Sequence, residues 1–365
     1  MIKICLVAGA RPNFMKIAPL MRTMRNYPEI QPFLVHTGQH YDEKMSNLFF
    51  NELQIPRPDI HLEIGSHSQA VQTAKIMVAF EQVLLKEQPD LVLVVGDVNS
   101  TIGCALPSVK LHIPVAHVEA GLRSFDRKMP EEINRVLTDA ISEYLFVTEP
   151  SGKQNLLREG VPEERIYCIG NVMIDTLLAN KTRAAESSVL ERLRIIPKEY
   201  ALLTLHRPSN VDIRETFLRI LDALEDIQNS LPIIFPVHPR TQKRLAEFGL
   251  AKRIEAMSNV QLIAPLGYLD FLKIMSEAKV VLTDSGGIQE ETTILGVPCV
   301  TLRETTERPI TIEQGTNIVV GTCTERIIAE TMGILRSWKD SLCRPDLWDG
   351  KAAERIVTIL IEQLK

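Results

Sequence analysis

Short apolar runs alternate with helical patterns along almost all of this 365-residue chain, and this alternation limits the possible folds more than any other feature. In chain order the apolar runs are 2–8, 32–36, 91–95, 114–118, 144–148, 166–169, 200–205, 232–237, 260–263, 279–283, 298–302 and 317–320. Amphipathic stretches of helical spacing lie among them, at 69–88, 131–143, 212–229 and 268–278. The run Leu91–Val95 is apolar on both faces, which is typical of a central parallel strand. We therefore expect an α/β protein with parallel sheets covered by helices on both faces.

Two domains are expected, because 365 residues are more than one hydrophobic core usually serves. The two halves of the pattern look like copies of one architecture, so we predict Rossmann-like domains at 1–171 and 172–349. The polar segment 180–199, with the helix before it, is interpreted as the passage from one to the other. The last helical pattern, within 350–365, is expected to pack back on the first domain.

Composition and charge exclude several classes of protein. The formal net charge is −5 and acidic and basic residues are interspersed, so no basic stripe for nucleic acid and no polybasic membrane segment is present. Met1 leads directly into a strand-like run without a cleavage site, and no stretch approaches the roughly 18 apolar residues that span a membrane. The six cysteines are scattered without a CxxC pair, which favours neither disulfides nor zinc. These features predict a soluble protein of the reducing cytoplasm.

The first candidate site residues follow the first apolar run, where a parallel sheet collects its ligands at the carboxyl ends of the strands. Gly9 permits a tight turn, and the helix that starts after it presents free backbone N–H groups. Arg11 and Lys16 bring two cations to this edge. The alternative is a solvated loop with ordinary surface bases.

A second candidate anion site follows the run 279–283. Ser285, Gly286 and Gly287 lead from a predicted strand into a helix, where backbone amides, a hydroxyl and the helix dipole favour a phosphate. Glu291 lies further along that helix and could accept hydrogen bonds from ribose hydroxyls. The alternative is a glycine-rich helix cap without a ligand.

Carboxylates and histidines follow other predicted strands. Asp97, Glu119 and Glu132 come from the first half, and His206 and His238 from the second. Each carboxylate could instead cap a helix or favour its dipole. Together, opposed carboxylates and a histidine suit removal and return of a proton at carbon. The chain lacks a Gly-x-Ser-x-Gly elbow, a Walker loop and a complete Gly-x-Gly-x-x-Gly, which disfavours acyl transfer, NTP hydrolysis and NAD chemistry.

Six motifs occur in one order along the chain, and the set resembles the non-hydrolysing UDP-N-acetylglucosamine 2-epimerases. They are Gly-Ala-Arg-Pro-x-x-x-Lys (9–16), Gly-Asp (96–97), His-Val-Glu-Ala-Gly-Leu-Arg (117–123), Pro-Glu-Glu-x-Asn-Arg (130–135), Thr-Asp-Ser-Gly-Gly-Ile-Gln-Glu-Glu (283–291) and Thr-Thr-Glu-Arg-Pro (305–309). The resemblance implies the GT-B arrangement of two Rossmann-like domains facing a central cleft. It also implies a homodimer that needs no nicotinamide or metal cofactor.

The reaction that the resemblance implies interconverts UDP-GlcNAc and UDP-ManNAc. It proceeds by anti elimination of UDP to a 2-acetamidoglucal, followed by re-addition. The catalytic residues implied are Asp97, Glu119, Glu132 and, beside the diphosphate, His206. The substrate-binding residues implied are Arg11, Lys16, Arg135, His238, Phe271, Ser285, Gly286, Gly287, Glu291 and Arg308, with Arg303 as a further candidate at the phosphates.

Two departures from the family pattern leave the exact sugar open. The stretch Thr37–Met45 differs from the corresponding stretch of allosteric bacterial members, so the sequence leaves open whether substrate at a second site activates the protein. His206-Arg207-Pro208 replaces a His-Arg-Arg-Glu run. Alternatives are therefore a 2-epimerase of UDP-2,3-diacetamido-glucuronate, a hydrolysing 2-epimerase, a GT-B glycosyltransferase and a non-enzymatic nucleotide-sugar sensor.

Overall fold

The computed structural model describes residues 1–38, 52–338 and 344–365. The chain forms two compact units, and each is described by itself. Unit 1 comprises Met1–Ala179 with Asp346–Lys365, and unit 2 comprises Asn180–Pro345. The predicted division at 171/172 falls where helix α7 (Val172–Ala185) begins, whereas the units divide inside that helix. Its first turns belong with unit 1, where the Thr176 hydroxyl donates to the Met15 carbonyl at 2.5 Å.

Unit 1 contains a seven-stranded parallel sheet in the order β3-β2-β1-β4-β5-β6-β7. Its strands are β1 (Ile2–Ala8), β2 (Ile30–His36), β3 (Ile60–His61), β4 (Leu91–Val95), β5 (Val115–Val118), β6 (Tyr144–Val147) and β7 (Ile166–Cys168). Six of these strands match predicted runs. The two-residue strand β3 was not predicted, because two residues are too short to give a periodic pattern.

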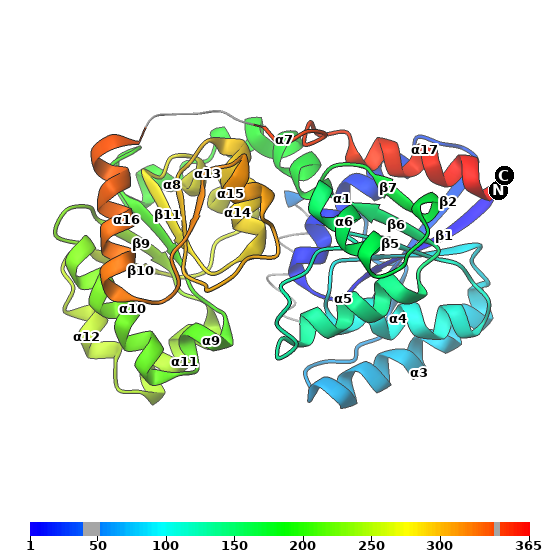
Figure 1. Ribbon diagram of the computed structural model, residues 1–365, viewed down its shortest axis with the longest axis horizontal. Coiled ribbons are helices and arrows are strands. Elements are labelled where there is room, and N and C mark those ends of the chain that lie inside the picture. The colour runs from blue at the N-terminus through cyan, green and yellow to red at the C-terminus, as the bar shows by residue number, and fades with distance from the viewer. Residues whose placement is uncertain (39–51, 339–343) are drawn as a thin grey trace. The chain divides into compact units, whose positions relative to one another are not determined.

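Helices cover both faces of this sheet, which explains why the central strand is apolar throughout. Figure 1 shows α3 (Gln69–Glu87), α4 (Asn99–Lys110) and α5 (Pro130–Ile141) on one side. On the other side lie α1 (Arg11–Met24) and the C-terminal α17 (Ala352–Leu364), and α17 packs on α1. Helix α6 (Pro150–Arg158) packs on the end strands β6 and β7, where its Leu156 joins Leu145, Val147 and Ile166 in a buried cluster. A short 3₁₀ turn, η1 (Glu163–Arg165), precedes β7. All five residues of β4 are buried.

The C-terminal helix is held on unit 1 by buried hydrogen bonds. The Asp175 carboxylate accepts the N–H groups of Ala352 and Ala353 at 3.1 and 2.7 Å, and so caps the start of α17. The indole N–H of buried Trp348 donates to the Thr148 carbonyl at 2.9 Å.

Unit 2 contains a six-stranded parallel sheet in the order β10-β9-β8-β11-β12-β13. Its strands are β8 (Ala201–Thr204), β9 (Ile233–Pro236), β10 (Val260–Ile263), β11 (Val280–Thr283), β12 (Cys299–Thr301) and β13 (Asn317–Val319). Each lies within one of the predicted runs. The expectation of an α/β protein with two parallel sheets is confirmed.

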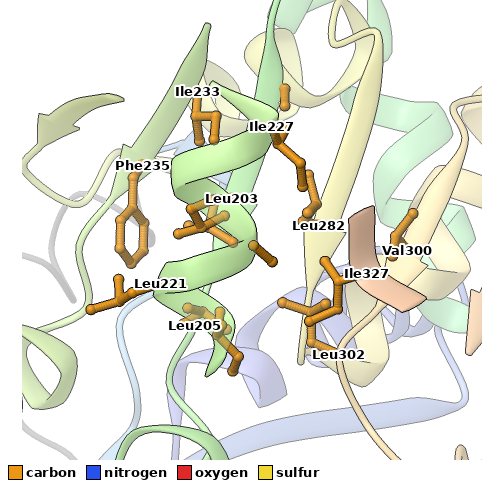
Figure 2. Close-up of a cluster of buried hydrophobic side chains, with 14 of the residues drawn as sticks. Leu203, Leu205, Leu221, Ile227, Ile233, Phe235, Leu282, Val300, Leu302 and Ile327 are labelled. Atoms are coloured by element: carbon orange, nitrogen blue, oxygen red, sulfur yellow. The ribbon is translucent and has the colours of Figure 1, made fainter. Parts of the chain in front are cut away.

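The core of unit 2 lies between one face of its sheet and two long helices. Its helices are α8 (Val189–Leu193), α9 (Pro208–Val211), α10 (Arg214–Ile227), α11 (Pro239–Glu247), α12 (Ala251–Glu255), α13 (Tyr268–Ser276), α14 (Gly286–Leu295), α15 (Ile310–Glu313) and α16 (Thr324–Ser337). Figure 2 shows Leu203 and Leu282, from neighbouring strands, in one buried cluster with Leu221 of α10 and Ile327 of α16. Burial of this apolar face fixes the strands whose ends carry the candidate site.

Both sheets have a point at which the strand order reverses. In unit 1 the chain runs outward from β1 to β2 and β3, then crosses to β4 on the other side of β1. Unit 2 repeats this pattern with β8 and β11. The loops that follow such neighbouring strands diverge, and ligands bind at this place in open parallel sheets. The topology thus indicates the loops after β1, β4, β8 and β11 as candidate sites.

None of the helices in the described ranges is long and apolar enough to cross a membrane.

Candidate active site

In unit 1 an asparagine ties the two loops at the reversal point together. The Asn13 side-chain carbonyl accepts the N–H groups of Gly9 and Ala10 at 3.0 and 2.9 Å. Its amide group donates to the carbonyl of Val95, the last residue of β4, at 3.2 Å. Arg11, predicted to bind substrate, is the first residue of α1. The sequence motif contained Asn13 but did not indicate its structural role.

A buried ion pair joins α1 to the loop after β5. Lys16 Nζ pairs with Glu119 Oε2, and both side chains are almost fully buried. Gly96, at φ +68°, leaves space for this pair, because a Cβ atom there would lie 2.8 Å from Lys16 Nζ and 3.2 Å from Glu119 Oε2. Two residues predicted separately, one as a substrate contact and one as a catalytic carboxylate, therefore meet.

The backbone at Glu119 is strained. Its φ is +73°, which costs a non-glycine residue about 1–3 kcal/mol. The N–H groups of Glu119 and Ala120 both donate to the Phe146 carbonyl of β6 at 3.1 Å, which holds this conformation. Strain of this kind is concentrated at functional sites.

The other two predicted carboxylates share one arginine. Arg135 Nε and Nη2 donate to Asp97 Oδ2 at 3.0 and 2.8 Å, and Nη1 bonds Glu132 Oε2. Glu132 also accepts the Ser124 N–H, the Ser124 hydroxyl and the Phe125 N–H, each at 2.9 Å. Arg135 and Glu132 are buried, whereas the Asp97 side chain is about one-quarter exposed. The structure thus places Arg135 between two carboxylates.

In unit 2 a buried aspartate orients the predicted histidine. Asp284 Oδ2 accepts the N–H groups of His206 and Arg207 at 3.0 and 2.9 Å, and Oδ1 lies 2.9 Å from His206 Nδ1. Burial opposes ionisation of Asp284, but the His206 ring and these N–H groups outweigh it and hold its pKa below the ordinary value. The His206 side chain is 37 % exposed, and its ring centroid lies 5.6 Å from that of exposed His238.

The start of α14 forms the second candidate anion site. Ser285 is the N-cap residue, and its N–H donates to the Thr283 hydroxyl at 3.0 Å. Gly286 and Gly287 begin the helix. A Cβ atom on Gly286 would lie 2.6 Å from Arg308 Nη1 and 2.9 Å from Glu307 Oε1, so these buried charges lie directly against the helix start.

Buried arginines and glutamates support this helix start. Arg308 Nε lies 2.7 Å from Glu290 Oε1, and its Nη1 donates to Glu307 at 2.8 Å. Arg303 Nη2 lies 2.8 Å from Glu307 Oε2, and Arg207 Nη2 lies 3.8 Å from Glu307 Oε1. Three guanidinium groups therefore face two carboxylates. The excess positive charge, with the helix dipole, favours an anion here.

The predicted ribose-binding carboxyl lies deeper in the same unit. Glu291 is buried and accepts the Tyr268 hydroxyl at 3.0 Å. Burial raises the pKa of Glu291 to about 8, assisted by nearby Glu290 and opposed by the Tyr268 hydrogen bond. At neutral pH this carboxyl is therefore mainly protonated and can both donate and accept hydrogen bonds. Phe271, predicted to line the uracil pocket, is half-buried on α13, which packs beside α14.

The raised pKa of Glu291 predicts a pH-dependent stability. Above the ordinary carboxyl pKa the unfolded chain loses this proton, whereas the folded chain keeps it up to about pH 8. Stability from this group is complete at low pH and falls as pH rises through that window. We expect the free energy of unfolding of the wild type to fall by a few kcal/mol between pH 5 and pH 8 because of this group, and Glu291→Gln to remove that part of the fall. Urea unfolding of the ligand-free protein measures it. Glu255→Gln, at an exposed glutamate, is the control. If the free energy of unfolding depends on pH in the same way in Glu291→Gln and in wild type, Glu291 does not have the raised pKa.

Several supporting residues were not predicted as site residues. Asp284, Glu307 and Tyr268 hold predicted residues in place, and His117 with Asp139 joins two of the turns in unit 1. The first two lie inside the quoted motifs, but only tertiary structure reveals their partners. From the stretch Thr37–Met45, residues 39–45 lie outside the described residues. In the described ranges, no group of three or more His, Cys, Asp or Glu side chains is arranged to hold a metal ion.

Comparison with known proteins decides the family. The sequence model of the family described as UDP-N-acetylglucosamine 2-epimerase matches residues 22–361. The chain belongs to this family. A curated UDP-N-acetylglucosamine 2-epimerase from Methanocaldococcus jannaschii is 46 % identical over 98 % of this chain and 99 % of its own length.

Other members of the epimerase family bear on the fold and the sugar. A crystal structure of the M. jannaschii UDP-GlcNAc 2-epimerase, in complex with UDP-GlcNAc and UDP, matches with a TM-score of 0.92 at 45 % identity and covers 99 % of this chain and 100 % of that one. A UDP-2,3-diacetamido-2,3-dideoxy-D-glucuronate 2-epimerase from Pseudomonas aeruginosa is 40 % identical over 90 % of this chain and 90 % of its own length.

Proposed function

We propose that this protein is a non-hydrolysing UDP-N-acetylglucosamine 2-epimerase, an isomerase that interconverts UDP-GlcNAc and UDP-ManNAc. The observation that carries the proposal is the set of three carboxylates at one sheet edge of unit 1, each paired with a cation, in a chain of this family. Lys16 pairs with Glu119, and Arg135 pairs with both Asp97 and Glu132. The similar M. jannaschii enzyme, solved with UDP-GlcNAc and UDP, supports the substrate.

In this proposal unit 2 holds the UDP portion of the substrate. The Ser285 hydroxyl and the N–H groups of Gly286 and Gly287 bind the diphosphate, because the helix dipole and the excess arginine charge favour an anion there. The neutral Glu291 carboxyl exchanges hydrogen bonds with ribose hydroxyls, and Phe271 lines the uracil pocket. Binding at a helix start needs no metal ion.

Unit 1 supplies the acid and base groups for the sugar. A carboxylate removes the C2 proton while the C1–O bond breaks, and that bond's electron pair leaves with UDP. The C2–H pair becomes the C1=C2 double bond of 2-acetamidoglucal. In the return step a carboxyl group delivers a proton to the other face of C2, and a UDP oxygen attacks C1. Asp97, Glu119 and Glu132 share these transfers.

His206 stabilises the departing diphosphate. Asp284 Oδ1 lies at its Nδ1 and orients the ring, and Nε2 of the protonated ring can donate to a phosphate oxygen. Arg11 and His238 are the remaining proposed substrate contacts.

The proposal is tested by NMR of UDP-GlcNAc with purified protein in deuterated water. We expect a reversible mixture with UDP-ManNAc, deuterium at C2 and UDP still attached to the sugar. Free N-acetylmannosamine with UDP would identify a hydrolysing enzyme instead. No exchange at C2 without an acceptor would favour a glycosyltransferase.

UDP-2,3-diacetamido-glucuronate is the second candidate substrate, favoured by the similar P. aeruginosa enzyme. The same NMR experiment on this sugar, run in parallel, decides between the two. The sugar with the higher kcat/KM is the substrate.

We also propose that the protein is a cytoplasmic homodimer. Five cysteines in the described ranges are free thiols, as is usual in a reducing compartment. Helix α3 exposes Val71, Val78 and Leu85 at seven-residue spacing, and α5, which like α3 packs against α4, exposes Ile133 and Leu137. Such a stripe is typical of a surface that packs against another helix.

The stripe predicts the effect of a charge on the oligomeric state. We expect Val78→Glu to shift the protein from dimer to monomer, because it buries a carboxylate in an apolar contact. Analytical ultracentrifugation measures the shift. Ile213→Glu, at an exposed apolar residue of unit 2, is the control. An unchanged dimer in Val78→Glu would place the interface elsewhere.

A further inference from the structure

We propose that His117 and Asp139 are positioning residues of the epimerase site, which hold the turns carrying Asp97 and Glu119 in one fixed arrangement. The inference rests on the proposed function, because it assigns both residues to that reaction. Neither residue needs to touch the substrate.

His117, the third residue of β5, is fully buried and bonded at both ring nitrogens. Its Nδ1 lies 2.6 Å from Asp139 Oδ1, and its Nε2 lies 2.8 Å from the Gly96 carbonyl oxygen. A carbonyl oxygen and a carboxylate only accept hydrogen bonds. Both ring nitrogens therefore face oxygen acceptors, and the ring is held from two sides.

Asp139 is the ionised partner of this ring. Burial favours its protonated form, but His117, Arg123 and the Gly121 N–H outweigh burial and lower its pKa. Its Oδ2 accepts the Gly121 N–H at 3.0 Å and lies 2.7 Å from Arg123 Nη2. Both carboxylate oxygens are thus engaged.

The two residues connect the turns that carry the proposed catalytic groups. Gly96 immediately precedes Asp97, and Gly121 follows Glu119 by two residues. Both glycines have positive φ, +68° and +78°, so neither turn has an ordinary backbone conformation. One buried hydrogen-bonded path therefore runs from the Asp97 turn through His117 and Asp139 to the Glu119 turn.

Helix α5 extends this path to the third carboxylate. Glu132, Arg135 and Asp139 have the spacing i, i+3 and i+7, so they lie on one face of the helix. All three are buried. A shift of α5 would move the Glu132 carboxylate and the anchor of the Glu119 turn together.

The arrangement acts through position. Arg123 Nη2 lies 2.7 Å from Asp139 Oδ2, and Arg123 donates to Glu159 at 2.8 and 2.6 Å. Loss of one hydrogen bond of His117 leaves these charged groups in place. It should therefore displace the proposed catalytic carboxylates more than it alters the charge they experience.

Two substitutions at His117 each retain one of its two hydrogen bonds and remove the other. His117→Gln places an amide N–H near the position of Nε2 and retains the bond to Gly96. His117→Asn places one near Nδ1 and retains the bond to Asp139. For each variant we expect kcat for UDP-sugar epimerisation to fall about 10- to 100-fold with KM changed less than about threefold, because a displacement near 1 Å costs this much in rate.

Asp175→Ala is the matched control. It removes another buried carboxylate of unit 1 that accepts two backbone N–H groups, but those groups start α17 instead of a catalytic turn. We expect it to lower thermal stability while kcat stays within about twofold of wild type. An equal loss of kcat in Asp175→Ala and the His117 variants, at equal loss of stability, would overturn the proposal. Wild-type kcat in folded His117→Gln and His117→Asn would also overturn it.

Amide hydrogen exchange gives a readout that does not depend on turnover. We expect faster exchange of Gly121 and its turn in His117→Gln, with the N-terminus of α17 unchanged, and the reverse in Asp175→Ala. If the wild type turns over no UDP-sugar, the proposed function fails, and the exchange data still decide whether His117 fixes these turns. Unchanged protection at Gly121 in His117→Gln would reject the inference.

Discussion

Glu119→Gln is expected to lower kcat for epimerisation by about 10²- to 10⁴-fold, the usual contribution of a positioned acid or base. The amide keeps the size of the side chain but cannot take or deliver the C2 proton. Glu119 is held in a strained conformation and buried against Lys16, so the structure gives it a fixed position. UDP affinity, measured by calorimetry, should stay within about threefold of wild type, because the proposed UDP contacts lie in unit 2.

Glu131→Gln is the matched control for this prediction. Glu131 precedes Glu132 in the first turn of α5 and is only partly buried. The same change of carboxylate to amide should leave kcat within about twofold of wild type. Asp97→Asn and Glu132→Gln should resemble Glu119→Gln. Full turnover in all three variants would reject the assigned roles, and loss of UDP affinity together with kcat would indicate a structural cause.

Gly286→Ala is expected to weaken UDP binding by about 10- to 100-fold, which corresponds to about 1.4–2.7 kcal/mol. The added Cβ would lie 2.6 Å from Arg308 Nη1 and 2.9 Å from Glu307 Oε1. Both atoms belong to a buried ion-pair network with Glu290, so they cannot move without breaking other contacts. The start of α14 must shift instead, and its N–H groups would no longer meet the diphosphate.

Gly333→Ala provides the control, because it makes the same change in helix α16 of the same unit. A Cβ at Gly333 has no neighbouring atom within 4 Å. The substitution should leave UDP affinity unchanged and should stabilise the helix by about 0.5–1 kcal/mol. Calorimetry with UDP and thermal unfolding measure both effects. Wild-type UDP affinity in Gly286→Ala would place the diphosphate away from this helix start.

The two units use the same topological position for different chemistry. In each sheet the candidate site includes the loops after the two strands at which the strand order reverses and the loop after the next strand, which is β5 in unit 1 and β12 in unit 2. In unit 1 these loops bring carboxylates and cations together, whereas in unit 2 they bring a histidine, a helix start and an excess of arginine. The shared fold explains where the residues lie, and the residue types explain what each edge can do.

The sequence determined the strands and the sheet edges on which the candidate site residues lie. Buried parallel strands are apolar on both faces, so a local pattern was enough to locate twelve of the thirteen strands that the described residues form. The polar residues at their carboxyl ends then had to lie on the corresponding sheet edges. Gly96 and Gly286 indicated a turn and a helix start, but the sequence did not show which side chains would clash with a Cβ atom at these positions.

Only the tertiary structure decided which of these residues meet. Lys16 and Glu119 are 103 positions apart, and they pair because β1 lies beside β4 while β4 lies beside β5. His117 reaches both Gly96 and Asp139 for the same reason. The raised pKa of Glu291 likewise depends on burial against neighbouring elements. Local periodicity contains no information on strand order or on desolvation, because both arise from contacts between segments that are distant in the chain.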